Sequence, residues 1–328
     1  MKAVKKQIDE LNVELTLTIE NADYAEAERK KLADCRRKAE FKGFRKGNVP
    51  ASLIQKLYGE QVRAEAVNDV ISAKLGEEIK DMKILGEPIS SEKQPEIDWK
   101  SDEPYTFVFD LGLSPEFDIE AQKTDSVYLY NIEITAKAKE EISKSLKKYY
   151  DEKKEKKTDE EIDKEVTERL EGEYKQEAEW RLTKDIRDYY VKKAGISLPE
   201  DFLKRWLFVA NNGKITKEDI EKDFAGFVDD FKWQLVRGKF VEKFGIKIEK
   251  KDIEEAASAF VTYQYAMYGI GNVPEDMVKE AAQRVLADRN QVSRLEEQVE
   301  DQKVLAKIKE AITVKAKKIT ADKFRELK

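Results

Sequence analysis

The sequence contains no histidine and only one cysteine, Cys35, among its 328 residues. Without imidazole, neither a Ser-His nor a Cys-His nucleophile pair is possible, and no zinc site can use nitrogen ligands. A single thiol also excludes an internal disulfide and a cage of thiolates. We therefore expect no metal site and no catalytic residue, and we interpret Cys35 as a small residue on a helix.

The sequence also lacks the G-x-x-x-x-G-K-[ST] motif, which excludes ATP turnover by that kind of phosphate loop, and we expect no cofactor. Long hydrophobic runs are missing as well. The first residues, MKAVKKQIDELNVELTL, contain no apolar core of the length that a secretory signal needs. No segment approaches the ~18 apolar residues of a membrane span. These absences predict a cytoplasmic protein.

Charged residues, in contrast, are abundant: Asp, Glu, Lys and Arg make up 40% of the chain, against about 25% in ordinary globular proteins. Hydrophobic residues also reach 40%, so the chain can bury a core and still carry much solvated surface. This balance favours long, slender helices, since slender shapes need more polar covering for each buried residue. The net charge of −6 argues against a general nucleic-acid binder.

Residues 1–115 are predicted to form a small α+β domain. Apolar and polar residues alternate between positions 11 and 19, which predicts a strand with one buried face. A helix follows, and Pro50 opens a second helix at a position where its missing N–H costs nothing. The sequence Gly-Glu-Pro at 86–88 breaks the chain before a second strand at 104–113.

Residues 116–157 are predicted to form an extended connector with strand character at 127–134, followed by a helix through Tyr150. The sequence DEKKEKKT at 151–158 is a wholly polar junction. Beyond it, the domain at 158–328 should be helical almost to its end. We therefore predict an α+β protein with an elongated, all-α C-terminal domain.

One helix of that last domain carries apolar residues at every fourth position. Each step of four overshoots a full turn by ~40°, because one residue turns ~100°. The apolar stripe therefore winds around the helix, which should contact different neighbours along its length. The positions are Ile162, Val166, Leu170, Tyr174, Ala178, Leu182, Ile186 and Tyr190.

The segment EFKGFRKGNVPASLI at 40–54 places an aromatic residue beside two cations, between two glycines and a proline. Gly43 and Gly47 permit backbone angles that other residues avoid. A tight loop between two helices would push Phe44 outwards together with its cationic neighbours. Alternatively, Phe44 folds back as a core anchor. Residues 29–46 contain nine Lys or Arg against two Asp or Glu, a local charge of +7 that favours a docking surface for an anionic partner.

The string G-F-R-K-G-x-x-P at 43–50 resembles the ribosome-docking signature of the trigger factor family of bacterial chaperones. Similarity extends to the connector LSPEFDIEAQKTDSVYLYNIEIT, to the start of the helical domain at 158–207, and to RLEEQVEDQKVLAKIKEAITVKAKKIT near the C-terminus. The resemblance implies docking on the large ribosomal subunit near the tunnel exit, through ribosomal protein and rRNA. The residues that it assigns to docking are Lys42, Gly43, Phe44, Arg45, Lys46, Gly47 and Pro50.

One departure from the family pattern concerns enzymatic activity. Members of this family usually carry an FKBP-like prolyl isomerase domain of about a hundred residues between connector and helical domain. Here the chain passes from KSLKKYYDEKKEKKT directly into the helical domain, without the aromatic-rich β-sheet sequence of an isomerase. Either this lineage lacks the domain, or the sequence was shortened and joined near 151–158.

The sequence therefore leaves three possible functions. The first is an ATP-independent holdase chaperone that docks on the ribosome and shields nascent or unfolded polypeptides. The second is a peptidyl-prolyl cis-trans isomerase, against which the missing domain argues. The third is a helical scaffold without chaperone activity. The resemblance favours the first, and it also implies weak self-association into homodimers.

A holdase needs a broad, adaptable apolar surface, which aromatic and methionine side chains provide. The segment FVTYQYAMYGI at 260–270 is the strongest candidate, and we expect Phe260, Tyr263 and Met267 to share one side of its helix. The alternative for each residue is packing in a helical core. The predicted client-binding residues are Phe260, Tyr263, Tyr265, Met267, Tyr268, Phe227 and Phe231.

Overall fold

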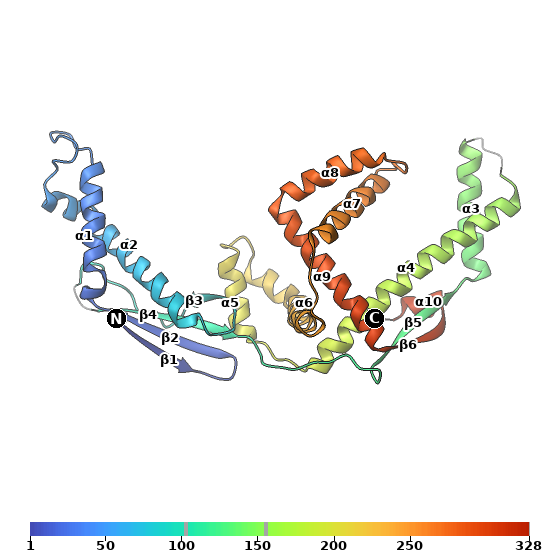
Figure 1. Ribbon diagram of the computed structural model, residues 1–328, viewed down its shortest axis with the longest axis horizontal. Coiled ribbons are helices and arrows are strands. Elements are labelled where there is room, and N and C mark those ends of the chain that lie inside the picture. The colour runs from blue at the N-terminus through green and yellow to red at the C-terminus, as the bar shows by residue number, and fades with distance from the viewer. Residues whose placement is uncertain (102–103, 154–156, 328) are drawn as a thin grey trace. The chain divides into compact units, whose positions relative to one another are not determined.

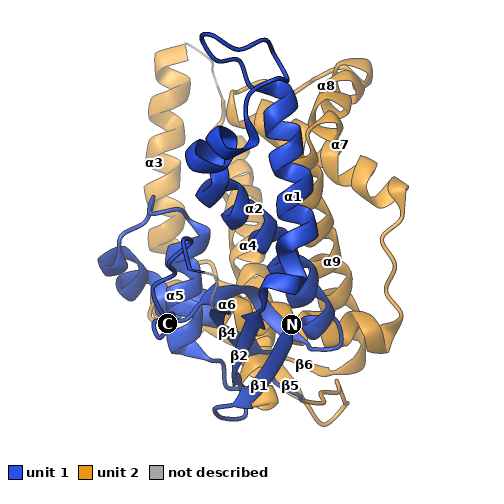
Figure 2. Ribbon diagram, turned by 90° about the vertical axis from the view of Figure 1, so that its left-hand side faces the viewer, with its two compact units in different colours: residues 1–116, 197–228 blue, residues 117–196, 229–328 orange. Residues whose placement is uncertain are grey.

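The computed structural model describes residues 1–101, 104–153 and 157–327 (Figure 1). The chain forms two compact units (Figure 2). Unit 1 comprises residues 1–116 and 197–228, and unit 2 comprises residues 117–196 and 229–328. This division differs from the predicted boundaries, because residues 197–228 were expected to belong to the helical domain at 158–328.

Unit 1 is built on an antiparallel sheet of order β1-β2-β4-β3. The strands are β1 (Lys2–Gln7), β2 (Asn12–Ile19), β3 (Ile84–Ser90) and β4 (Tyr105–Leu113). The alternation predicted for β2 is confirmed, since its inward side chains Val13, Leu15, Leu17 and Ile19 are buried. The expected chain break at 86–88 is wrong, because a register shift between Leu85 and Ile89 accommodates this Gly-Glu-Pro sequence within β3.

Helices α1 (Asn21–Lys38) and α2 (Ala51–Ile79) lie side by side (Figure 2), and the start of α1 and the later part of α2 pack on this sheet. Their core contacts include Tyr24 from α1 and Ala66, Val67 and Ile71 from α2. Pro50 is the N-cap of α2, so the second helix begins where the sequence predicts. The ends of α1 and α2 are joined by the glycine-bracketed loop.

The later part of unit 1 is α5 (Glu200–Ala210) and the first turns of α6 (Lys217–Phe244), which return to the sheet. Two glycines permit close packing there: a Cβ on Gly112 would lie 2.5 Å from the ring of Phe202, and one on Gly86 would lie 2.5 Å from that of Trp206. Arg205 adds an ion pair of 2.7 Å to Asp110 on β4. These contacts explain why α5 belongs to the unit that contains the sheet.

Unit 2 is organised around the long helix α4 (Asp159–Ala194), whose buried residues are the eight predicted positions from Ile162 to Tyr190. The first four pack against α3 (Ala136–Lys153). The last three pack against α6 and α9 (Arg289–Ala311). The predicted change of neighbours along the helix is therefore confirmed. Of the polar junction at 151–158, residues 154–156 lie outside the described part of the chain.

A two-stranded parallel sheet completes this part of unit 2. It pairs β5 (Ser126–Glu133) with β6 (Thr313–Thr320), which is followed by the short helix α10 (Ala321–Arg325). The expectation of helix almost to the end is wrong at β6. Its sequence TVKAKKIT contains β-branched residues that favour a strand, and pairing with the connector strand β5 supplies its hydrogen bonds.

Asp125 attaches the connector to α4 within unit 2. Its carboxylate is buried and accepts hydrogen bonds from the hydroxyls of Tyr189 (2.8 Å) and Tyr190 (2.9 Å). The ammonium group of Lys193 lies 2.7 and 2.8 Å from its two oxygens. Burial alone would raise the pKa of Asp125, but these hydrogen bonds and one from the Gln122 amide outweigh it and lower the pKa to about 2.

Helices α7 (Lys250–Met267) and α8 (Glu275–Ala287) form a hairpin that packs on α9. Its core is small and contains Ala257, Val261, Ala282 and Leu295. Among the described residues, none of the helices combines the length and apolarity needed to cross a membrane.

Candidate functional site

The loop between α1 and α2 is shaped by two consecutive tight turns. The amide of Phe44 donates to the carbonyl of Phe41 (3.0 Å), and the amide of Asn48 donates to that of Arg45 (2.9 Å). Gly43 and Gly47 adopt φ values of +94° and +81°, which residues with a side chain rarely adopt. The two glycines therefore permit the backbone reversals on either side of the tip.

The C-terminal end of this loop is fixed to the helices. Val49 is fully buried, and its carbonyl accepts a 2.7 Å hydrogen bond from Nε of Arg36 on α1. Pro50 then begins α2. The anchor of the loop is thus Val49, whereas Phe44 was the residue that the sequence offered for this role.

The loop tip itself points into solvent. Phe44 is 44% exposed, and Lys42, Arg45 and Lys46 are exposed beside it. Lys46 pairs with Glu40 at 2.8 Å, whereas Lys42 and Arg45 have no ion pair with any described residue. The structure therefore brings an aromatic ring and two available cations together on one loop.

An apolar surface that the sequence analysis missed adjoins this loop. The ring of Phe41 packs edge-on against that of Tyr58 on α2, with 6.5 Å between ring centroids. Tyr58 and its neighbour Leu57 are both exposed. The signal was present in the sequence, because α2 carries more apolar residues than one buried face accommodates.

The second candidate surface is the tip of the α7–α8 hairpin. Gly269 has a φ of +78° and ends the helix, while the amide of Ile270 donates to the carbonyl of Tyr265 (3.0 Å). The side chains that remain in solvent are those of Tyr263, Met267, Tyr268, Ile270 and Met277. Of these, Ile270 and Met277 were not among the predicted client-binding residues.

The predicted grouping of side chains in this hairpin needs correction. Tyr263 and Met267 are 65% and 71% exposed, but Phe260 is only half-buried beside them and packs with Tyr265 on the core of the hairpin. The reason is that Phe260 flanks the face that carries Ala257 and Val261. Phe260 and Tyr265 therefore support the hairpin, and the exposed group surrounds its turn.

The remaining two predicted residues lie on a different helix, α6. Phe227 is half-buried and stacks on the buried Phe224, with 5.9 Å between ring centroids. Phe231 is half-buried one turn further along. Phe227 and Phe231 are therefore partly packed on α6, a different element from the one that carries the aromatic residues of the hairpin turn.

The hairpin tip is also distinguished by its lack of charge. Residues 256–274 contain no Asp, Glu, Lys or Arg, in a chain of which 40% is charged. The loop at 39–50 has the opposite character, since it gathers cations around one aromatic ring. The two candidate surfaces therefore offer different chemistry to a partner.

Fold and candidate surfaces together define a helix-rich α+β protein whose two candidate surfaces are an exposed basic loop and the uncharged, apolar tip of a helical hairpin. The chain belongs to the trigger factor family. Residues 1–149 match the family model described as "Bacterial trigger factor protein (TF)". Residues 178–328 match the one described as "Probable trigger factor, C-terminal domain".

Individual relatives match parts of the chain. The trigger factor of Francisella philomiragia is 36% identical over 106 residues, which is 32% of this chain and 24% of the relative. That of Francisella tularensis subsp. novicida is 34% identical over 108 residues, 33% of this chain and 24% of the relative. The chain thus spans about a quarter of the length of these relatives.

A solved structure described as "Promiscuous Substrate Recognition in Folding and Assembly Activities of the Trigger Factor Chaperone" shares the fold. Its TM-score is 0.53 at 15% identity, and the match covers 94% of this chain and 99% of that chain. Between the two family matches lie residues 150–177. The described residues of this stretch belong to α3 and α4, apart from the short link at 157–158, and they include no strand.

Proposed function

We propose that this protein is an ATP-independent chaperone that docks at the ribosomal tunnel exit and shields nascent or unfolded polypeptides. The observation that carries the proposal is the exposed tip of the loop at 39–50, where Phe44 stands between available cations in a member of the trigger factor family. An aromatic ring flanked by cations can combine apolar burial with contacts to an anionic surface.

The docking experiment replaces Phe44, Arg45 and Lys46 together with alanine. We expect cosedimentation with ribosomes to be lost while helicity, measured by circular dichroism, stays unchanged, because the anchor Val49 and both glycines remain. A matched control replaces Tyr149, Lys144 and Lys148 on α3, which likewise removes an exposed aromatic ring and two cations. Undiminished cosedimentation of the loop variant, or equal loss in the control, would overturn the docking role.

The client surface in this proposal is the uncharged tip of the α7–α8 hairpin. Unfolded chains expose scattered apolar side chains, so their chaperone needs a shallow and deformable surface rather than a shaped pocket. Two exposed methionines and two exposed tyrosines around the turn meet this need. The alternative of a scaffold without chaperone activity would leave the aggregation of an unfolded client unsuppressed.

We further propose that the protein is not a prolyl isomerase. The helical hairpin of α3 and α4 stands where the family resemblance places the isomerase domain. A short proline peptide should therefore isomerise in the presence of the protein with its uncatalysed time of tens of seconds. Saturable acceleration in this assay would show that an isomerase site exists elsewhere in the chain.

The same proposal places the protein in the cytoplasm, where ribosomes meet emerging chains, with weak homodimers forming away from the ribosome. Release of a client would require no nucleotide if the client buries its own apolar side chains as it folds. The charged surface around the hairpin then keeps a bound client in solution.

A further inference from the structure

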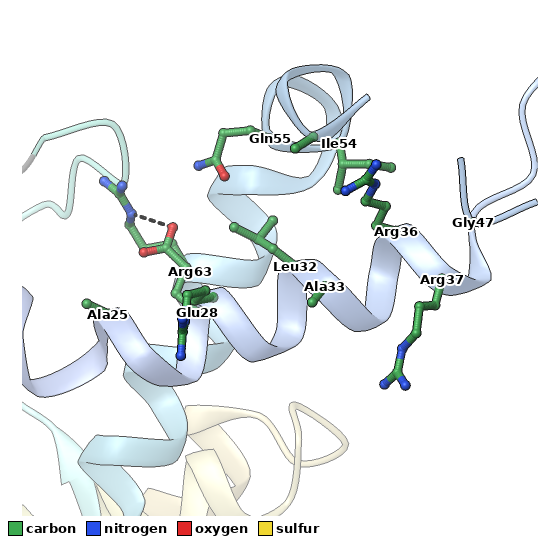
Figure 3. A pocket seen from close by; sticks show the side chains of 12 residues that line it. Ala25, Glu28, Leu32, Ala33, Arg36, Arg37, Gly47, Ile54, Gln55 and Arg63 are labelled. Carbon is green, nitrogen blue, oxygen red and sulfur yellow. Dashed lines mark hydrogen bonds and ion pairs between the residues drawn. The ribbon is translucent and has the colours of Figure 1, made fainter. Parts of the chain in front are cut away.

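A groove of about 670 Å³ lies between α1 and α2 in unit 1 (Figure 3). Its floor is aliphatic and is formed by small or branched side chains from both helices. Figure 3 places Leu32 and Ala33 in the middle, with Arg63 and Glu28 on one side and Arg36 and Arg37 on the other. The volume suits a ligand of drug-like size or a few residues of peptide.

Arginine and lysine side chains of α1 differ in their position relative to this groove. Arg29, Arg36 and Arg37, all three arginines of the helix, line it, whereas its three lysines do not. Lys30 pairs instead with Glu26 (2.7 Å), and Lys31 pairs with Asp69 (2.9 Å). Arginine presents a planar fork that binds a carboxylate through two parallel hydrogen bonds, which lysine cannot do.

The only carboxylate among the described residues that line the groove is already neutralised. Glu28 is buried and pairs with Nε of Arg63 at 3.2 Å. The Nη1 atom of Arg63 donates to the carbonyls of Trp99 and Ser101, each at 3.2 Å, which holds this pair in place. Arg37 also pairs with Asp34 on the same helix, so the exposed guanidinium groups of Arg29 and Arg36 leave the groove with an excess of positive charge.

We propose that this groove binds a short acidic peptide, with its carboxylates on the arginines and an apolar side chain on the floor between them. A nucleic acid is the other polyanion to consider. Sites for single-stranded nucleic acid combine cations with aromatic rings on which bases stack, and the described lining of this groove contains no aromatic ring. The aliphatic floor instead matches a leucine-like side chain.

The groove lies outside the docking loop tip, so its ligand is a second partner of unit 1. Gly47 lines its edge, but Phe44 and Arg45 do not. Arg36 contacts both sites, because it also holds the carbonyl of Val49. Variants that test the groove should therefore leave Arg36 in place.

The test measures fluorescence anisotropy of a labelled Glu-Asp-Leu-Asp-Glu peptide titrated with the full chain. We expect the double variant Arg29→Gln, Arg37→Gln to bind about fivefold more weakly or worse, since two forked contacts are lost. The matched control Lys30→Gln, Lys38→Gln removes the same charge from the same helix outside the groove, and it should bind within about twofold of wild type. Equal weakening in both variants would overturn the groove as the site.

A second variant separates shape from charge. Ala33→Trp fills the floor without changing any charge, and Ala33 is exposed, so the helix should form normally. We expect this variant to bind the peptide no longer. The triple-alanine variant of Phe44, Arg45 and Lys46 should bind it as wild type does. Three outcomes would each overturn the proposal. Ala33→Trp could bind the peptide with wild-type affinity, the wild-type protein could fail to bind the peptide, or it could bind hexauridylate RNA more tightly than the peptide.

Discussion

At the residue scale, Asp125 shows how a single carboxylate fixes a connector. The loop before β5 reaches α4 through this side chain, which contacts Tyr189, Tyr190 and Lys193. A buried charge is tolerated only where partners replace its water, and here two hydroxyls, an ammonium group and a backbone amide do so. The attachment therefore depends on the ionised form of Asp125.

This dependence predicts a pH window for stability. The folded-state pKa of Asp125 is about 2, below the unfolded value of ~3.9. Its contribution is therefore present above about pH 4 and is lost as the pH falls towards 2. Asp125→Asn should lower the free energy of unfolding of unit 2 at pH 7 by about 2–3 kcal/mol in urea titrations, and this difference should shrink at pH 2–3.

The control for this experiment is Asp118→Asn. Asp118 also pairs with a lysine, Lys243 at 2.6 Å, but its side chain is 78% exposed, so its loss should have little effect. If the cost of Asp125→Asn were the same at every pH, packing rather than charge would explain the role of this residue.

Also at the residue scale, the loop illustrates what a sequence leaves open. The glycines at 43 and 47 predicted a reversal of the chain, and in the structure both have a positive φ. Whether Phe44 or another side chain anchored the loop could not be decided, because the answer depends on Arg36, thirteen residues before the Val49 carbonyl that it holds. Local pattern predicts the turn, whereas the anchor is a tertiary contact.

At the scale of elements, periodicity predicted what lies within one helix or strand. The eight buried positions of α4 and the buried face of β2 follow from spacing alone. The strands β1, β3 and β6 were missed. β1 has no buried face and so no alternating pattern, β3 contains the irregular Gly-Glu-Pro sequence, and β6 pairs with a strand distant in the sequence. β6 in particular carries four exposed residues in its middle and is a strand because β5 supplies a pairing edge.

The α7–α8 hairpin is the element on which the client hypothesis depends. Met267→Glu with Tyr263→Ser should weaken suppression of client aggregation by about tenfold, because two exposed apolar side chains are lost from the contact surface. Ribosome cosedimentation should be unchanged. Light scattering of a denatured client during refolding measures the first activity.

A matched control for that variant is Gln264→Glu with Thr262→Ser. Both residues are exposed on the same turns of α7, and the control adds the same charge and a serine without removing an aromatic ring or a methionine. If the control were as impaired as the test variant, charge rather than apolar surface would be responsible. Joint loss of suppression and docking would indicate misfolding.

At the scale of the whole molecule, unit 1 is discontinuous in sequence. Residues 197–228 return to the sheet that residues 2–113 contribute, through contacts such as Phe202 on Gly112. Composition and periodicity assign these residues to helices, but they carry no information about which core the helices join. This is why the predicted boundary at 158 separated residues that pack together.

At the same scale, the two surfaces proposed for docking and for client binding differ in charge. Residues 29–46 carry a local charge of +7 in a chain of −6, whereas residues 256–274 carry none. Ions screen exposed charges beyond about 10 Å at 0.1 M salt but leave apolar burial intact or strengthen it. The two surfaces should therefore respond differently to the same change of solvent.

Raising salt from 50 to 200 mM should weaken ribosome cosedimentation by about tenfold or more, as expected for two or three screened contacts from Lys42, Arg45 and Lys46. Suppression of client aggregation should stay the same over this range, because the hairpin tip has no charge to screen. The experiment requires an uncharged, apolar client, so that the client's own aggregation responds little to salt.

If ribosome docking did not change with salt, its binding energy would come mainly from Phe44 and the adjoining apolar residues Leu57 and Tyr58. Parallel loss of both activities would mean that client and ribosome share one charged surface, which the separation of cations from the hairpin tip argues against.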